Sequence, residues 1–306
     1  MSIHTARRSR RPARVCYGPG GMAIFLLHGI VDEYVPGASA YRNYVPRAMF
    51  ERYLRERAAP FADWRGDGST GDLLTVDDAT RAGADACLAA RRLGHPVLFF
   101  VNPYQVVSGE PYFFSLLAAL LDARRVTSAE YGGTRYDLAD PAAVQALRRA
   151  VRAAVMRLPA AESHAAVARL ASMLGADGVT VAAHEQPLRR ADLIALRDAG
   201  VRIENHGWSH VEIDAIDDDA FARHVREGRD WLQRELGVDA SLYAVPFGAT
   251  DVAPPRQRWV DGGYFLASDR FPRGRVGAHG WNRRDLLIEM RARNRVAAYL
   301  AARTRS

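Results

Sequence analysis

The sequence of 306 residues predicts an α/β fold with parallel strands, and three observations lead to this prediction. Short apolar runs alternate with helical segments, and a strand, a helix and a second strand follow one another between Leu73 and Val101. Several apolar runs end abruptly in polar residues, at the position where parallel α/β folds carry their chemistry. A stretch near the middle, residues 111–174, departs from this alternation.

The first part of the chain predicts three strands and two helices. Val97–Val101 is apolar throughout, as expected of a strand that is buried on both faces. The second helix is predicted to stop at Gly94 and Pro96. The predicted strands are Ile24–Leu27, Leu73–Val76 and Val97–Val101, and the predicted helices are Arg47–Arg57 and Ala82–Leu93.

Residues 111–174 predict helices only, in the form of an insertion between two strand–helix units rather than an independent domain. Pro141 fits the first position of a helix, with Asp140 as its N-cap. The predicted helices are Tyr112–Arg124, Pro141–Leu158 and Ser163–Leu174.

After the insertion the α/β alternation resumes. Gly200 and Gly237 are expected to end the helices that precede them. The predicted helices are Arg190–Ala199, Asp218–Leu236 and a closing helix at 285–302, and the predicted strands are Val201–Glu204, Ser241–Val245 and Tyr264–Ala267.

The net charge of +7 and the pI near 9.7 come in large part from arginines near the two ends of the chain. We expect residues 1–20 to be a flexible basic terminus and residues 21–306 to form the folded unit. A basic stripe interleaved with aromatic residues is missing, which argues against nucleic acid binding. Cys16 and Cys87 are far apart, so they predict neither a disulfide framework nor a thiolate metal site.

The N-terminal region could be mistaken for a signal peptide, because arginines precede the apolar run Met22–Val31. That run contains His28, and acidic residues follow it directly, so we interpret it as a strand that ends in a functional histidine. The sequence lacks an apolar run of ~20 residues, the length needed to span a membrane. We therefore expect a cytoplasmic protein without a membrane span.

Asp77 and Asp78 stand at the end of the apolar run that begins at Leu73. Adjacent carboxylates are costly, because each raises the pKa of the other unless a cation compensates. A metal ion bound by one aspartate would supply that cation, and the other aspartate could then accept a proton. The alternative is a solvated turn of the kind that we expect at Asp217-Asp218-Asp219, which should cap the following helix.

His206 and His210 follow the predicted strand that ends at Glu204. Residues four apart share one face of a helical turn, so both imidazoles could reach one ion. A zinc protease with a His-Glu-x-x-His motif is excluded, because Gly207 stands where its glutamate would be. Two histidines that only satisfy backbone groups are the alternative interpretation.

Four segments, in the same order, resemble the polysaccharide deacetylases, carbohydrate esterase family four, over about residues 23–290. Thr75-Val76-Asp77-Asp78-Ala79 resembles the Thr-Phe-Asp-Asp-Gly signature, and Asn205-His206-Gly207-Trp208-Ser209-His210 resembles the paired-histidine signature. Tyr243-Ala244-Val245-Pro246-Phe247-Gly248 is similar to the third signature, and Leu27-His28-Gly29-Ile30 resembles the opening of many members.

The resemblance implies a distorted (β/α)7-type barrel, here with the helical insertion between the first two signatures. It implies that Asp78, His206 and His210 bind a metal ion and that Asp77 is the catalytic base. It places His28 at the site, where it supports protonation of the leaving group or binds substrate. Two imidazoles and one carboxylate would leave metal positions open for water and a substrate carbonyl.

The sequence also departs from the family pattern. Ala79 replaces a glycine, and Ala244 stands where many members have an arginine that orients the base. A C-terminal Leu-x-His signature is missing, and His279 is a rival to His28 as general acid. Trp208, Phe247 and Gly248 are candidate substrate contacts, although Trp208 could equally be core.

The function expected is metal-dependent removal of an N-acetyl group from an amino sugar, with a small or carrier-linked substrate. One divalent ion is expected, zinc first, with cobalt, nickel, manganese or iron as alternatives. A hydrolase of a non-sugar amide, cyclic imide or formamide with the same site is the second hypothesis. A carbohydrate-binding barrel without turnover is the third. An iron oxygenase fits poorly, because its two-histidine, one-carboxylate site usually belongs to all-β folds. The sequence leaves the oligomeric state open.

Overall fold

The computed structural model describes residues 22–32, 44–65, 71–248, 250–268, 270, 274–276 and 278–290. The predicted basic terminus, residues 1–20, lies outside these residues. So does most of the predicted closing helix, of which 286–290 are helical. Among the described residues, no helix is long and apolar enough to cross a membrane.

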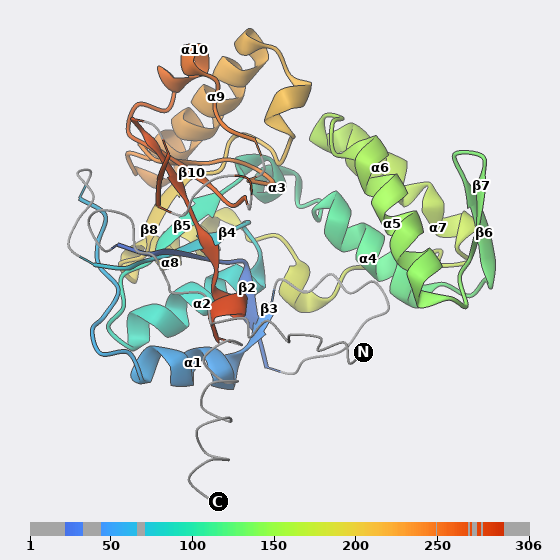
Figure 1. Ribbon diagram of the computed structural model, residues 1–306, viewed down its shortest axis with the longest axis horizontal. Coiled ribbons are helices and arrows are strands. Elements are labelled where there is room, and N and C mark those ends of the chain that lie inside the picture. The colour runs from blue at the N-terminus through green and yellow to red at the C-terminus, as the bar shows by residue number, and fades with distance from the viewer. Residues whose placement is uncertain are drawn as a thin grey trace, which may run out of the picture.

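The elements alternate as an α/β protein should, and most agree with the predicted ranges to within a few residues (Figure 1). The strands are β1 Ile24–Leu27, β2 Gly29–Val31, β3 Tyr44–Pro46, β4 Leu73–Asp77, β5 Leu98–Val101, β6 Ser128–Tyr131, β7 Thr134–Asp137, β8 Arg202–Asn205, β9 Tyr243–Ala244, β10 Tyr264–Leu266, β11 Gly274–Val276, β12 Gly280–Asn282 and β13 Arg284–Asp285. The helices are α1 Arg47–Arg55, α2 Arg81–Arg92, α3 Pro103–Ser108, α4 Phe113–Ala123, α5 Pro141–Val155, α6 Ala160–Ala168, α7 Leu170–Met173, α8 Arg190–Asp198, α9 Asp218–Leu236 and α10 Pro254–Gln257, with 3-10 turns η1 Ala183–Glu185 and η2 Ile213–Ala215.

Within the described parts of the chain, nine strands form one sheet in the order β11-β12-β10-β9-β8-β5-β4-β1-β13. All neighbouring pairs are parallel except β11 with β12. Residues of α2 and α9 pack in one hydrophobic cluster against the same face of the sheet, as the (β/α) barrel prediction requires. The α/β prediction is confirmed.

The two ends of the parallel sheet meet in one short segment of chain. Gly280–Asn282 pairs with β10, Arg284–Asp285 pairs with β1, and Arg283 lies between them. If β12 and β13 are counted as two halves of one strand, seven parallel strands remain, as the resemblance implies. Pairing is not continuous through this segment, so the barrel is not fully closed among the described residues.

Side chains alternate between two cores along these strands. Leu74 and Val76 of β4 belong to the large cluster that packs the sheet against the helices, whereas Leu73 belongs to the cluster that also contains Trp64. Asp77 is four residues after Leu73, and residues an even number apart lie on the same face of a strand. Its side chain therefore points to the same, inner side of the sheet as Leu73. Trp64 packs edge-on against Trp281 with ring centroids 4.7 Å apart and fills this interior.

The insertion, residues 111–174, has its own hydrophobic core, and the helix-only prediction for it is wrong. Ser128–Tyr131 and Thr134–Asp137 form a hairpin, β6 with β7, around Gly132 and Gly133. Both glycines adopt positive φ, which the tight two-residue turn requires. The predicted helix Ser163–Leu174 is also divided into α6 and α7.

The helix ends predicted from single residues are confirmed. Asp140 caps α5 by accepting a hydrogen bond from the Ala142 N–H, and Pro141 is the first helical residue. Asp217 caps α9 in the same way at Ala220.

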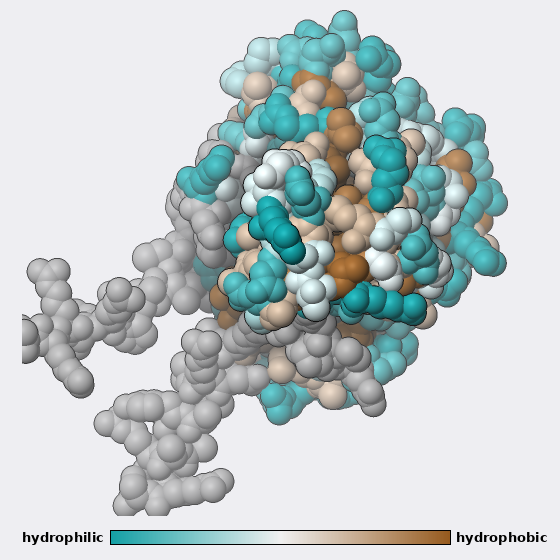
Figure 2. All heavy atoms as spheres, turned by 90° about the vertical axis from the view of Figure 1, so that its right-hand side faces the viewer, coloured by the Kyte–Doolittle hydropathy of each residue, from teal (hydrophilic) through white to brown (hydrophobic). Residues whose placement is uncertain are grey.

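In Figure 1 the insertion projects to one side of the sheet and its helices. Figure 2 shows the molecule from that side, where apolar residues gather in a strip between hydrophilic ones. The insertion follows α3, which itself follows the carboxyl end of β5. It therefore leaves the sheet at the end that carries the two aspartates.

Candidate metal centre

The two aspartates occupy a sharp turn between β4 and α2. Asp77 is the last residue of β4, and Asp78 adopts a left-handed backbone conformation with φ of 68°. Thr80 then caps α2 by accepting a hydrogen bond from the Gly83 N–H. A left-handed aspartate is uncommon and costs energy, and such residues cluster at functional sites. The turn separates the two carboxylates, so they can take different partners.

His206 comes directly after β8, and its ring is held from behind. Its Nδ1 lies 2.8 Å from the carbonyl oxygen of Ala244. A carbonyl can only accept, so Nδ1 carries a hydrogen. In the neutral imidazole Nε2 then keeps its lone pair, which is the usual arrangement of a metal-binding histidine. Nε2 lies 3.6 Å from Asp78 Oδ1.

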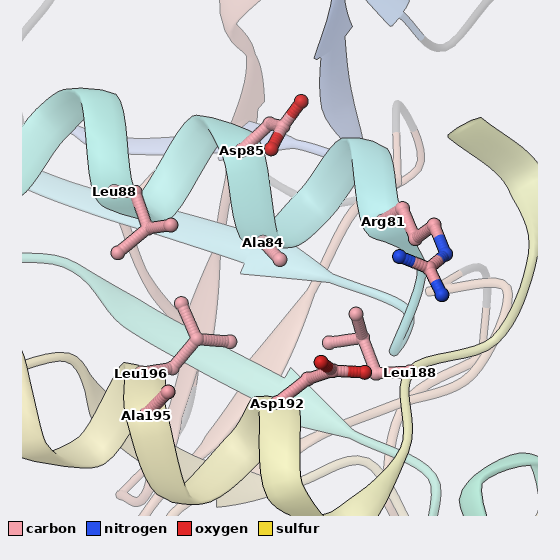
Figure 3. A pocket seen from close by; sticks show the side chains of 8 residues that line it. All are labelled: Arg81, Ala84, Asp85, Leu88, Leu188, Asp192, Ala195 and Leu196. Carbon is pink, nitrogen blue, oxygen red and sulfur yellow. The ribbon is translucent and has the colours of Figure 1, made fainter. Parts of the chain in front are cut away.

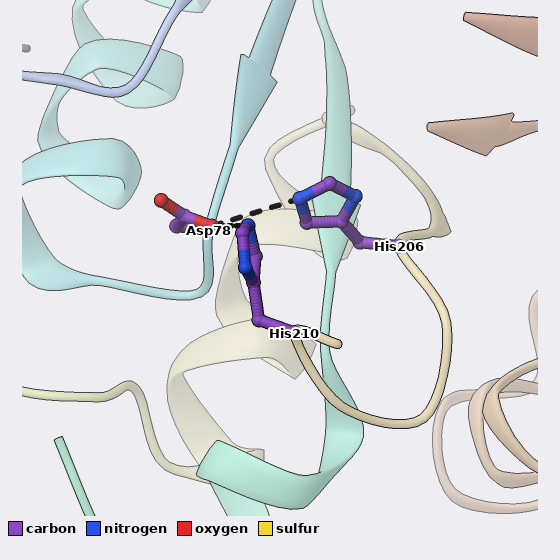
Figure 4. A group of neighbouring side chains, drawn as sticks. All are labelled: Asp78, His206 and His210. Carbon is purple, nitrogen blue, oxygen red and sulfur yellow. Dashed lines mark ion pairs between the residues drawn. The ribbon is translucent and has the colours of Figure 1, made fainter. Parts of the chain in front are cut away.

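His210 reaches the same carboxylate from a loop, not from the helical turn that the spacing predicted. Gly207 has φ of 79°, and residues 206–212 are not helical. A left-handed residue at this point breaks any helix. The loop still brings His210 Nε2 to 3.5 Å from Asp78 Oδ1 (Figure 4). Burial lowers the pKa of His210 to about 3, so its imidazole is neutral near pH 7.

These three side chains fit a divalent metal ion. One ligand atom from each of Asp78, His206 and His210 lies within 4.8 Å of the others. Asp78 Oδ1 and His206 Nε2 are buried, and neither has a hydrogen-bond partner among the described residues. Burial acts to raise the pKa of Asp78, but the imidazoles outweigh it and lower the pKa to about 2. An ionised carboxylate and imidazole nitrogens are among the usual ligands of zinc.

Asp77 has a different partner, Arg283. The guanidinium donates two hydrogen bonds, from Nη1 to Asp77 Oδ1 at 2.6 Å and from Nη2 to Oδ2 at 2.7 Å. Both side chains are buried. Burial acts to raise the pKa of Asp77, but Arg283 and, to a smaller degree, His206 outweigh it, so the pKa is lowered. Asp77 is therefore an ionised carboxylate, 4.0 Å from His206 Nε2.

Arg283 is the main site residue that the sequence prediction missed. It follows the three-residue strand β12, which is too short to read as a strand from the sequence. It holds the carboxylate of Asp77, the role that the family gives to an arginine at the position of Ala244. The sequence contains only a weak indication of this role, which is that Arg283 stands two residues after the apolar Trp281.

The two candidate general acids lie at different ends of the barrel. His28 lies between β1 and β2, at the carboxyl end of β1, and its charge acts on the pKa of Asp77, Asp78 and His210. His279 is exposed and directly precedes β12, so it lies at the opposite, amino end of the parallel strands. The structure thus brings His28 to the aspartates and leaves His279 away from them.

The three candidate substrate contacts are placed differently. Phe247 packs edge-on against His210 with ring centroids 4.4 Å apart, so it lines the candidate metal centre. Gly248 completes the turn after Val245 and accepts a hydrogen bond from the Ala267 N–H. Trp208 is partly buried and packs against the large core between sheet and helices. Its position therefore agrees with the core alternative.

A groove of about 200 Å³ lies elsewhere, between α2 and α8 (Figure 3). Leu88 and Leu196 point toward each other from the two helices, and Arg81 and Asp192 also line the groove. Its lining contains none of Asp77, Asp78, His206 and His210, so it is separate from the candidate metal centre.

Residues 164–257 match the family model described as polysaccharide deacetylase. The match includes both histidines of the site and leaves the two aspartates outside it. The resemblance to polysaccharide deacetylases is confirmed. A search of curated proteins gives no match.

Solved structures of deacetylases share the fold. A Streptococcus pyogenes deacetylase, PplD, in complex with acetate is 11% identical, with 86% of this chain and 91% of that chain covered and a TM-score of 0.53. A putative polysaccharide deacetylase from Bacillus anthracis, BA0330, is 12% identical, with 86% and 64% covered and a TM-score of 0.51. At such identities the likeness concerns the fold alone.

Proposed function

We propose that this chain is a metal-dependent hydrolase that removes an N-acetyl group from an amino sugar. The observation that carries the proposal is that the two adjacent aspartates have different partners. Asp78 faces the two imidazoles, whereas Asp77 is held by Arg283 beside them. The polysaccharide deacetylase match supports the same class of reaction.

A divalent ion bound by Asp78, His206 and His210 would polarise the acetamide carbonyl and lower the pKa of a water molecule. Asp77, ionised and held in place by Arg283, accepts a proton from the water that attacks the carbonyl carbon. His28, in its protonated form, donates a proton to the nitrogen as the C–N bond breaks. The products are acetate and a free amine. Phe247 forms an apolar wall beside the reacting acetyl group.

Metal content and activity test this proposal together. We expect the unmutated chain to bind one zinc or similar divalent ion, and the Asp78→Ala and His206→Ala,His210→Ala variants to lose both metal and activity. His164→Ala, at a histidine of α6, is the control and should keep both. Full metal occupancy in the double-histidine variant would refute the assigned ligands.

A panel of substrates separates this function from its nearest rival, hydrolysis of a non-sugar amide, cyclic imide or formamide. Release of acetate from N-acetylated sugars, small or carrier-linked, is expected. Turnover of simple amides or cyclic imides alone would favour the rival. Sugar binding without any acetate release, with metal present, would favour a binding protein. We also propose a cytoplasmic location. Fractionation of the cells that make the protein tests it.

A further inference from the structure

A buried tyrosine at the start of the insertion contacts the turn that carries the aspartates. The hydroxyl of Tyr112 accepts a hydrogen bond of 2.9 Å from the Ala79 N–H. The same hydroxyl donates a hydrogen bond of 3.1 Å to Asn102 Oδ1. Tyr112 and Asn102 are buried, with exposed fractions of 1% and 0%. Both partners of the hydroxyl are therefore fixed and shielded from water.

Asn102 extends this connection to the histidine loop. Its side-chain nitrogen donates hydrogen bonds to the carbonyl oxygens of His206, at 2.6 Å, and Gly207, at 3.3 Å. Asn102 directly follows β5, which lies between β4 and β8 in the sheet. One continuous chain of hydrogen bonds thus runs from the turn after β4, across the end of β5, to the loop after β8.

We propose that Tyr112 and Asn102 are positioning residues that set the distance between Asp78 and His206, and so fix the geometry of the metal centre. The inference rests on the metal-dependent function proposed above. Asp78 and His206 come from different strands, and each stands directly after the last residue of its strand, β4 and β8 respectively. Partners of this kind behind the ligands orient them and tune metal affinity.

The proposal gives the insertion a part in the metal centre itself. Tyr112 is the residue directly before α4, and its ring stands edge-on to His210 with centroids 5.8 Å apart. Its ring also stacks on Phe114, with centroids 5.0 Å apart. The hydroxyl can be removed without loss of these ring contacts, so its contribution can be measured alone.

Tyr112→Phe is the direct test. It leaves the Ala79 N–H and Asn102 Oδ1 without their buried partner. We expect zinc affinity, measured by competition with a chelator, to fall by roughly 10- to 100-fold. The absorption spectrum of the cobalt(II)-loaded protein should also change, because it reports ligand geometry. Tyr136→Phe, the same substitution on β7 of the insertion, is the matched control and should leave affinity and spectrum unchanged.

A double-mutant cycle with Asn102→Ala supplies an independent measurement. If the two side chains act as one connection, the losses of zinc affinity in Tyr112→Phe and Asn102→Ala should not add in the double variant. Zinc affinity and a cobalt spectrum equal to those of the unmutated chain in Tyr112→Phe would overturn the inference, even if the melting temperature fell. Failure of the unmutated chain to bind zinc would instead overturn the proposed function on which the inference rests.

Discussion

Arg283 holds both carboxylate oxygens of Asp77 although the two residues are 206 positions apart in the sequence. The same guanidinium donates to the carbonyl oxygen of Leu266 through Nε at 3.2 Å and to Thr75 Oγ1 through Nη1 at 3.3 Å. Each of these contacts restricts the rotation of the arginine. A fixed arginine keeps its aspartate in one orientation, which is what a general base needs.

Removal of Arg283 should shift the pH dependence of catalysis. Arg283 lowers the pKa of Asp77 against burial, which acts to raise it, so Arg283→Met should raise that pKa. Protonated Asp77 cannot act as base, and the acidic limb of the kcat/KM profile should move to higher pH. At the optimum we expect roughly a 100-fold loss from the misplaced base.

The control for this measurement is Arg275→Met on the exposed strand β11. Its profile should match that of the unmutated chain. An unshifted acidic limb in Arg283→Met would show that Asp77 is not the group that titrates.

Asp77→Asn should separate catalysis from metal binding. Asparagine keeps the shape but cannot accept the proton, so kcat should fall by roughly 10²–10⁴-fold while the metal stays bound. The variant also leaves a buried guanidinium without its counter-charge, which should lower the free energy of unfolding by about 3 kcal/mol.

The double variant Asp77→Asn,Arg283→Met removes the unpaired charge. We expect it to recover part of the lost stability in denaturant titrations without regaining activity. Normal turnover by Asp77→Asn would place the base elsewhere.

His28→Ala tests the least direct of the catalytic assignments. The leaving amine needs a proton, and His28 lies at the same end of the barrel as the aspartates. Loss of one general acid should reduce kcat by roughly 100-fold or more, with metal content unchanged. His279→Ala, at the amino end of β12, should retain full activity. The reverse pattern of losses would transfer the role to His279.

Gly207→Ala should destabilise the histidine loop. A Cβ at this position would lie 1.8 Å from His224 Nε2, and φ is 79°. Overpacking and the left-handed backbone together should lower the free energy of unfolding by about 3 kcal/mol or more and weaken metal binding. Chemical denaturation and chelator competition measure the two effects.

Gly133→Ala is the matched control for that substitution. Its φ is 73°, and nothing lies within 4 Å of the added Cβ, so only the backbone strain remains. A loss of about 1–2 kcal/mol is expected, with metal binding intact. Equal losses in the two variants would mean that the contact with His224 does not constrain the loop.

The parts of this site that could be predicted from the sequence are those marked by a short run of consecutive residues. Asp77 ends a five-residue buried strand and Asp78 follows it, and such a run is visible without a structure. Arg283 follows a strand of three residues, too short to recognise, and its importance arises from contact with a distant strand. Asn102 carried a usable signal, because it is the first polar residue after an apolar strand.

Other predictions failed where the backbone departs from regular structure. The four-residue spacing of His206 and His210 suggested a helical turn, but Gly207 adopts a left-handed conformation against His224. The hairpin at Gly132 and Gly133 joins short strands with few apolar residues, so it lacked the alternation that marks a strand. We predict that residues 111–174 influence substrate choice, because they leave the sheet at the end that carries the two aspartates.

The short segment Gly280–Asp285 links the two ends of the parallel sheet and also carries Arg283. Its strands are brief, so it can detach locally at a lower free energy than the rest of the sheet. Each such opening would withdraw the arginine from Asp77 while the metal ligands on β4 and β8 stayed folded. On warming, activity would then be lost below the melting temperature of the whole molecule. The rate of amide hydrogen exchange in Gly280–Asp285 would rise over the same temperature range.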